Sequence, residues 1–259
     1  MKRKTMFSVS VVVVAILFGC VAPRQQLRSV HLKFERIPQP DNITCGPTSL
    51  RMVLNYYGHP VPHEEMMKHF TIFPHIGVLD PHICMAAMDF GFKAKTISFN
   101  YRVIHPSWTK LSRQELLQKL RTYFPKIKNY KDSVSAAGYI RYLERGGTIE
   151  FHPMSRKLIV HYLEKGIPVI AALDMEYLYN GTVHWTEFRP EHATHFVVIY
   201  GYDADKDVFQ VADPWYEVTI PNKEGTYEVP ADRLMTAILL GFQVNDGDLV
   251  IVEKPEQKK

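Results

Sequence analysis

Residues 41–50 read Asp-Asn-Ile-Thr-Cys-Gly-Pro-Thr-Ser-Leu and place one thiol, Cys45, at the start of an apolar helix. The helix is predicted to begin near Gly46 and Pro47, because proline has no N–H to lose at the first helical position. Apolar side chains then recur at helical spacing, at Leu50, Val53, Leu54 and Tyr57. Unpaired N–H groups at a helix N-terminus favour an anion, so Cys45 is a candidate thiolate nucleophile. The alternative is a buried structural cysteine.

Two apolar runs far along the chain supply candidate partners for this thiol. Residues 194–202 and 208–212 are each typical of a buried strand, and the residues between them suit a turn. If the two strands pair as a hairpin, His195 at the start of the first comes beside Asp213 at the end of the second. A cysteine nucleophile needs a base, and the base needs an orienting group. The sequence therefore predicts a triad of Cys45, His195 and Asp213.

Gln39 lies six residues before Cys45, where its side-chain amide can join the Cys45 N–H in holding the oxyanion of a tetrahedral intermediate. Together with Cys45-Gly46-Pro47, the His195-Phe196-Val197-Val198 strand and Asp213-Pro214, it resembles the C39-like peptidases. These are papain-fold enzymes related to the domains that cleave double-glycine leaders from bacteriocin precursors.

The resemblance covers roughly residues 35–99 and 155–220 and implies an α+β, papain-like fold, in which a helical part bearing the nucleophile packs on an antiparallel β-sheet part. It implies Cys45 as nucleophile, His195 as general base and acid, Asp213 as the residue that orients the imidazole, and Gln39 as oxyanion donor. Bacteriocin-processing members usually carry an acidic residue before the cysteine and are fused to a transporter. Here Thr44 takes that place, so we expect a stand-alone relative.

The implied chemistry is hydrolysis of a bond in a peptide or protein substrate. Acyl transfer to an amine or thiol uses the same thioester, and a non-catalytic peptide-binding lipoprotein would keep the fold. Both alternatives stay open, as do substrate identity and oligomeric state. We expect no cofactor and no metal, because two prolines separate His59 from His63 and nothing completes a tetrahedral ligand set around His192 and His195.

The first residues are typical of a targeting signal. Basic residues at positions 2–4 precede an apolar run over residues 6–18, which is too short to span a bilayer, where about 20 residues are needed. The run ends in Leu-Phe-Gly-Cys at residues 17–20, which resembles the lipobox of bacterial lipoproteins. The resemblance implies a signal peptide over residues 1–19 and a lipid anchor on Cys20. An uncleaved short anchor is the alternative.

Val21 follows Cys20 instead of the Asp that resembles an inner-membrane retention signal. We therefore expect a lipid-anchored protein of the bacterial cell envelope, in the outer membrane and facing the periplasm. A linker is expected over residues 20–34 and the peptidase domain over residues 35–259, with an insertion at about 101–147.

Positive charge is concentrated in the insertion. Without residues 2–4 the formal charge falls from +4 to +1, so nucleic acid is not an expected partner. Residues 101–147 nevertheless hold ten Lys or Arg against three Asp or Glu, a local charge of +7. This stretch could face anionic lipid or an acidic substrate, and a solvated helical face is the alternative.

Hydrophobic periodicity predicts the remaining elements. Helices are expected near residues 62–70, 80–90, 112–123, 132–145 and 155–165, with a helical turn at 230–239. Further strands are expected near residues 92–99, 167–173, 217–220, 226–229 and 249–253, with a loop over residues 176–191. Cys84 lies in an apolar helical segment and is expected to be a buried thiol, with a disulfide to Cys45 as the alternative.

Overall fold

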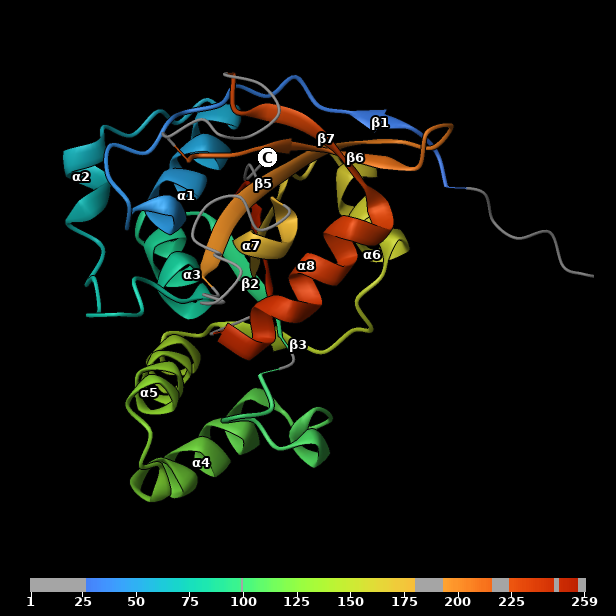
Figure 1. The fold of residues 1–259 in the computed structure, drawn as a ribbon. Helices are drawn as coiled ribbons and strands as arrows, with labels where there is room; N and C mark the ends of the chain where they lie inside the picture. The colour runs from blue at the N-terminus through green and yellow to red at the C-terminus, as the bar shows by residue number, and fades with distance from the viewer. Residues whose placement is uncertain (1–26, 99, 180–192, 216–223, 245–246, 256–259) are drawn as a thin grey trace, which may run out of the picture.

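The computed structural model describes residues 27–98, 100–179, 193–215, 224–244 and 247–255. Within them the chain forms one eight-stranded sheet, in the order β3-β2-β8-β4-β5-β6-β7, and β1 pairs separately with β5 (Figure 1). The strands are β1 Val30–His31, β2 Lys93–Ile97, β3 Thr148–Glu150, β4 Val169–Asp174, β5 Thr194–Asp203, β6 Val208–Ala212, β7 Thr226–Pro230 and β8 Leu249–Glu253.

Helices pack on both faces of this sheet. They are α1 Cys45–Tyr56, α2 His63–Met67, α3 Asp80–Asp89, α4 Arg113–Tyr123, α5 Tyr130–Glu144, α6 Arg156–Glu164, α7 Met175–Leu178 and α8 Ala231–Val244, with short 3-10 turns at Pro106–Trp108 and Phe124–Lys126. Side chains of the central strand β4 alternate, so that Ile170 packs with α1 and α3 while Val169 and Ala171 pack with α6 and α8. Each face of β4 therefore lies in its own apolar core.

The expected α+β fold is what the structure contains, and several elements match the predicted bounds. β6 and β8 occupy the predicted residues, and α1 begins at Cys45, as the Gly46-Pro47 pair indicates. α4 begins after a capping box in which the Ser112 hydroxyl accepts from the Glu115 N–H and the Glu115 carboxylate accepts from the Ser112 N–H. Local signals thus place these elements correctly.

Other elements differ from the prediction. The sheet is antiparallel except for the parallel β2–β3 pair. The helical turn expected at 230–239 is the 14-residue helix α8, because Leu234, Ala237 and Ile238 bury one continuous apolar stripe. The loop expected over residues 176–191 contains part of α7, and residues 180–192 lie outside the described part, as does the strand expected at 217–220.

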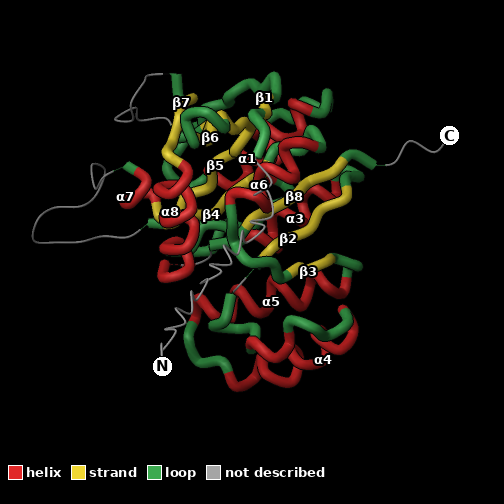
Figure 2. The backbone as a smooth tube through the Cα atoms, turned by 90° about the vertical axis from the view of Figure 1, so that its right-hand side faces the viewer, coloured by secondary structure: helices red, strands yellow, loops and turns green. Residues whose placement is uncertain are grey.

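The insertion at 101–147 forms a layer of its own, seen below the sheet in Figures 1 and 2. Its apolar cluster includes Ile104, Leu120 and Leu143. α5 contacts the rest of the fold through Gly138, where an added Cβ would lie 2.9 Å from the Pro81 ring at the start of α3. This close approach fixes α5 against α3.

A buried acidic cluster joins the insertion to the main fold. The Tyr139 hydroxyl donates to Asp80 Oδ1 at 3.1 Å and to Asp248 Oδ2 at 3.2 Å, and all three residues are buried. Burial, together with the nearby Asp248 charge, raises the pKa of Asp80 well above its ordinary value. Asp80 therefore holds its proton at pH values where an exposed aspartate is ionised.

This cluster predicts a pH-dependent stability. An acid whose pKa is raised on folding stabilises the native state at low pH, and that contribution is lost as the pH rises from about 4 towards the raised value. The contribution of Asp80 to the unfolding free energy should fall by up to about 1.4 kcal/mol per pH unit in this window. His82, whose pKa burial lowers to about 4, contributes in the opposite direction below about pH 6.5, so the test compares variants. In thermal denaturation between pH 4 and 8, the stability of Asp80→Asn should have a more positive slope with pH than that of the wild type, whereas Asp205→Asn on an exposed turn should keep the wild-type slope. Equal slopes for wild type and Asp80→Asn would contradict this reading of the cluster.

Residues 1–26, which include the expected signal peptide and Cys20, lie outside the described residues. β1 lies within the range 20–34 expected as linker and pairs with β5 through Val30 and Tyr202. The sheet therefore begins before the expected domain start at residue 35. In the described ranges no helix is long and apolar enough to cross a membrane.

Candidate active site

Cys45 is the first residue of α1 and is half-buried. The turn before it is held by the Asp41 carboxylate, which accepts from the Ile43 N–H at 2.9 Å and from the Thr44 hydroxyl at 2.8 Å. One turn into the helix, the Ser49 hydroxyl donates to the Phe196 carbonyl on β5 at 3.2 Å. The thiol is therefore carried by a helix that is fixed directly to the strand bearing His195.

His195 lies between Cys45 and Asp213. The predicted hairpin is confirmed, since β5 and β6 pair antiparallel with Val198 opposite Ala212. The His195 Nε2 donates to Asp213 Oδ1 at 2.8 Å, and Cys45 lies close enough to the same imidazole to raise its pKa. Since Nε2 is occupied by Asp213, Nδ1 is the ring nitrogen left for Cys45. The structure thus brings all three predicted triad residues together.

The imidazole is held in its charged form. Burial lowers the pKa of His195, but the Asp213 carboxylate and Cys45 raise it more, to about 10. At neutral pH the ring is therefore an imidazolium. A positive ring beside Cys45 stabilises negative charge on the sulfur, which is the form that attacks a carbonyl.

Asp213 is fully buried and accepts four hydrogen bonds. The His195 ring and the Trp215 N–H donate to Oδ1, both at 2.8 Å, and the hydroxyls of Tyr179 and Tyr227 donate to Oδ2, both at 2.6 Å. Burial raises the pKa of Asp213, but His195 and the two tyrosines lower the pKa by more than burial raises it, so the net shift is downward. The carboxylate therefore stays ionised beside His195.

Residues 213–215, which follow β6, are also hydrogen-bonded to Arg36 and Gln39 in the segment that precedes Cys45. The Arg36 Nε donates to the Asp213 carbonyl at 2.8 Å and its Nη2 donates to the Trp215 carbonyl at 2.5 Å. The Gln39 N–H donates to the Pro214 carbonyl at 2.7 Å. The segment that leads to Cys45 and the loop that carries Asp213 are thus bound to each other through main-chain groups.

Gln39 is almost fully buried, and its side-chain amide is fixed by one hydrogen bond. Nε2 donates to the Asp41 carbonyl at 2.5 Å, and no second hydrogen bond of this amide nitrogen is found within the described residues. Among the described residues Oε1 has no partner. The structure places Gln39 on the loop before Cys45 but gives it no hydrogen bond to Cys45 within the described residues.

A cavity of about 360 Å³ opens beside the thiol. Cys45, Val78 and Phe196 are among its lining residues. Gly46 is required for this arrangement, because a Cβ on that residue would lie only 2.4 Å from Val78 and would push the cavity wall away from Cys45.

Three positioning residues were not predicted from the sequence. Tyr179 and Tyr227 hold the Asp213 carboxylate, and Ser49 ties α1 to β5. Strand alternation offered a signal for Tyr227, which faces inward together with Val229 on β7. Nothing local distinguishes Tyr179 or Ser49, since their partners lie 34 and 147 residues away in the chain.

The second thiol is separate from this site. Cys45 and Cys84 are both free, so the alternative of a disulfide between them is excluded in this structure. Burial raises the pKa of Cys84 well above its ordinary value, so this thiol stays protonated. Within the described residues no group of three or more His, Cys, Asp or Glu side chains is arranged to hold a metal ion.

Residues 31–230 match the model of the Peptidase_C39-like family. The chain belongs to this family. It is accordingly a cysteine peptidase, and membership confirms the papain-like fold implied by the sequence resemblance. A search of curated proteins finds no match.

Three solved structures are among those that match this chain. A putative C39-like peptidase from Bacillus anthracis is 15% identical, covers 89% of this chain and 100% of its own length, and has a TM-score of 0.47. A double-glycine motif protease from an AMS/PCAT transporter, in complex with the leader peptide, is 16% identical, with coverage of 89% and 100% and a TM-score of 0.44. Xylellain, a cysteine protease from Xylella fastidiosa, is 11% identical, with coverage of 88% and 86% and a TM-score of 0.39.

The hydrogen bonds of Asp213 predict the effect of Asp213→Asn. Tyrosine hydroxyls can accept as well as donate, so the Asn amide can face Tyr179 and Tyr227 while its oxygen still accepts from His195 and Trp215. The geometry should survive, but the negative charge that raises the pKa of His195 is lost. We expect the His195 pKa to fall in an NMR titration and turnover to fall by about 100-fold or more, with a much smaller change in melting temperature. A loss of stability as large as the loss of rate would make Asp213 a structural residue only.

Proposed function

We propose that this chain is a lipid-anchored cysteine peptidase that hydrolyses a peptide or amide bond through Cys45, His195 and Asp213. The observation that carries the proposal is the buried His195 ring, which is hydrogen-bonded to the Asp213 carboxylate and lies close enough to Cys45 for that side chain to raise the pKa of the ring. Donors on both oxygens of Asp213 support it, since they hold the imidazole in one orientation.

At the start of the reaction, the Cys45 thiol has given its proton to His195. The thiolate attacks the substrate carbonyl carbon, and the resulting oxyanion is held by the Cys45 N–H and a side-chain amide N–H of Gln39. The His195 imidazolium then gives its proton to the leaving amine as the C–N bond breaks, which leaves a thioester on Cys45. His195 next removes a proton from water, the hydroxide attacks the thioester, and the thiol regains a proton as the acid departs.

Cys45→Ala should abolish turnover and labelling by a thiol-reactive acyl probe without a change in fold, because the variant lacks the attacking sulfur. Cys84→Ala is the matched control and should keep wild-type labelling, since the Cys84 thiol is buried and protonated. Intact mass measures the labelling, and circular dichroism measures the fold. Undiminished labelling of Cys45→Ala would refute the nucleophile assignment.

The substrate can be sought with the same pair of variants. Mass spectrometry should compare envelope peptides from cells that carry the wild type and Cys45→Ala, with Cys84→Ala as a third sample. Peptides that depend on Cys45 alone identify the cleaved bond. Products joined to a new amine or thiol, instead of free carboxylic acids, would favour the acyl-transfer alternative over hydrolysis.

The anchor is proposed from the sequence of residues 2–20. A cysteine lipidated at position 20 lies ten residues before Val30, the first residue of β1, and extended chain spans at most about 3.5 Å per residue. The catalytic domain would therefore stay within about 35 Å of the lipid headgroups. Such a tether favours substrates that are at or near the membrane surface.

Cys20→Ala should remove the protein from the membrane fraction or leave it unprocessed, because the acylated residue is absent. Cell fractionation and the mass of the N-terminal peptide report both outcomes. Val21→Asp is a second test. It places Asp after Cys20, in the pattern that resembles an inner-membrane retention signal, and should move the protein from the outer to the inner membrane. A Cys20→Ala protein that remained processed and membrane-bound would contradict the lipobox interpretation.

A further inference from the structure

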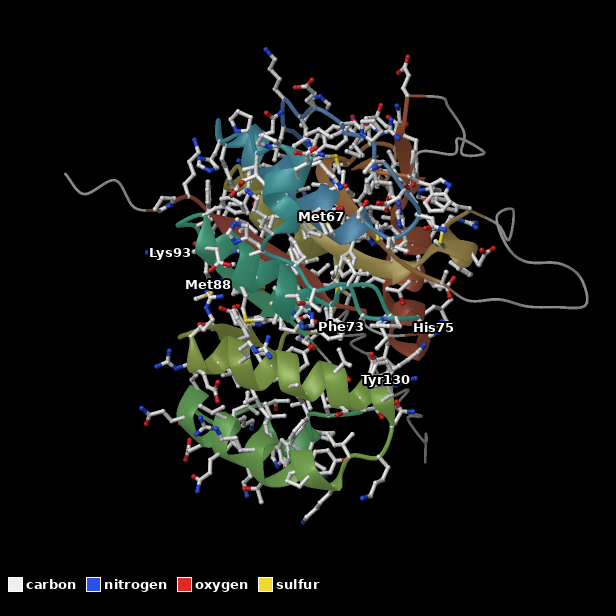
Figure 3. All side chains as sticks on the ribbon, turned by 90° about the vertical axis from the view of Figure 1, so that its left-hand side faces the viewer. Met67, Phe73, His75, Met88, Lys93 and Tyr130 are labelled. Carbon is white, nitrogen blue, oxygen red and sulfur yellow. The ribbon has the colours of Figure 1, made fainter. Side chains whose placement is uncertain are left out.

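The cavity beside Cys45 has largely apolar walls and two basic residues, Lys131 and His75. Ile43, Ile72, Val78 and Phe196 contribute apolar surface, and Lys131 approaches from α5. Figure 3 shows Phe73 and His75, on the loop of residues 72–78, above Tyr130 at the N-terminus of α5. The nucleophile of the main fold and the first turn of the inserted helix therefore line one cavity.

Lys131 is held at this place by the packing of α5. The Asn129 side chain caps the helix by accepting from the Asp132 N–H at 3.2 Å. Further along α5, Gly138 lies against Pro81, and Tyr139 donates to the buried carboxylates of the acidic cluster. Both contacts reach the start of α3, which directly follows the cavity wall. The position of Lys131 relative to Cys45 is thus set by rigid elements.

The charge of Lys131 is not neutralised within the described part of the chain. No hydrogen bond or ion pair there engages its ammonium group, and no described lining residue is acidic. Three of the nine other basic residues of the insertion form ion pairs: Arg102 with Asp132 at 3.9 Å, Arg121 with Glu144 at 2.7 Å, and Arg145 with Asp89 at 2.5 Å. An unpaired cation in an apolar cavity favours an anionic occupant.

We propose that Lys131 is a specificity-determining residue that selects an acidic side chain in the acyl part of the substrate. The proposal rests on the proposed function, since the acyl part is the portion that stays bonded to Cys45, and Cys45 lines the cavity. The apolar walls contact the methylene groups of the side chain, and the ammonium pairs with its carboxylate. A basic side chain in the same cavity meets a like charge and is rejected. A membrane surface cannot enter a cavity of about 360 Å³, so the charge of Lys131 points to substrate and not to anionic lipid.

The test uses peptidyl probes that share one thiol-reactive carbonyl and differ at a single side chain near it, as Glu, Gln or Lys. Labelling rates of the purified full chain are followed by intact mass. The wild type should react about fivefold faster with the Glu probe than with the Gln probe, and most slowly with the Lys probe. Lys131→Met should bring the Glu to Gln ratio close to one, and Lys131→Glu should reverse the preference in favour of Lys.

Lys128→Met is the matched control, because it removes the same charge three residues away from an exposed position outside the cavity. Its Glu to Gln ratio should equal that of the wild type. A wild type without preference for Glu, or a Lys131→Met variant with the wild-type ratio, would overturn the assignment of Lys131 and leave the proposed function intact. A chain that no probe labels, and whose Cys45 iodoacetamide also leaves unmodified, would overturn the proposed function together with this inference.

Discussion

The carboxylate of Asp213 draws four separate segments of the chain to one point. It accepts from His195 on β5, from Trp215 on its own loop, from Tyr179 after α7 and from Tyr227 on β7. A buried charge is tolerated only when it is fully hydrogen-bonded, so each donor is required to keep this residue ionised. The position of His195, and through it the environment of Cys45, depends on this set of contacts.

The acidic cluster shows the opposite outcome for the same residue type. Asp80 and Asp248 share the Tyr139 hydroxyl, and Asp80 lies near the charge of Asp248. Asp213 has a cation and three further donors, so it loses its proton, whereas Asp80 keeps one. Aspartates that are equally buried thus differ in charge because of their donors. Asp213 holds the His195 ring, and Asp80 joins the insertion to the main fold.

The elements that the sequence predicts well are those that local signals determine. The hairpin follows from two apolar runs and a turn, α4 from its capping box, and the start of α1 from Gly46 and Pro47. The donors to Asp213 and the contacts of Tyr139 depend on residues that meet only after folding, so no window of sequence contains them. In the sequence, Lys131 is one of ten basic residues at 101–147, and only the packing of the fold places it in the wall of the cavity that Cys45 also lines.

The parallel pairing of β2 with β3 has a consequence for how this enzyme can change. The chain leaves the sheet at Ile97 and rejoins it at Thr148, which pairs with Lys95, so the two ends of the inserted segment lie on adjacent strands and only two residues apart in register. Lengthening or exchanging a segment with adjacent ends alters the chain entropy only slowly with length. Provided that the contact with the start of α3 is kept, the inserted segment can be exchanged for another without disturbing the sheet. The family's scaffold could therefore acquire new substrate preferences by exchange of this segment, without alteration of Cys45, His195 or Asp213.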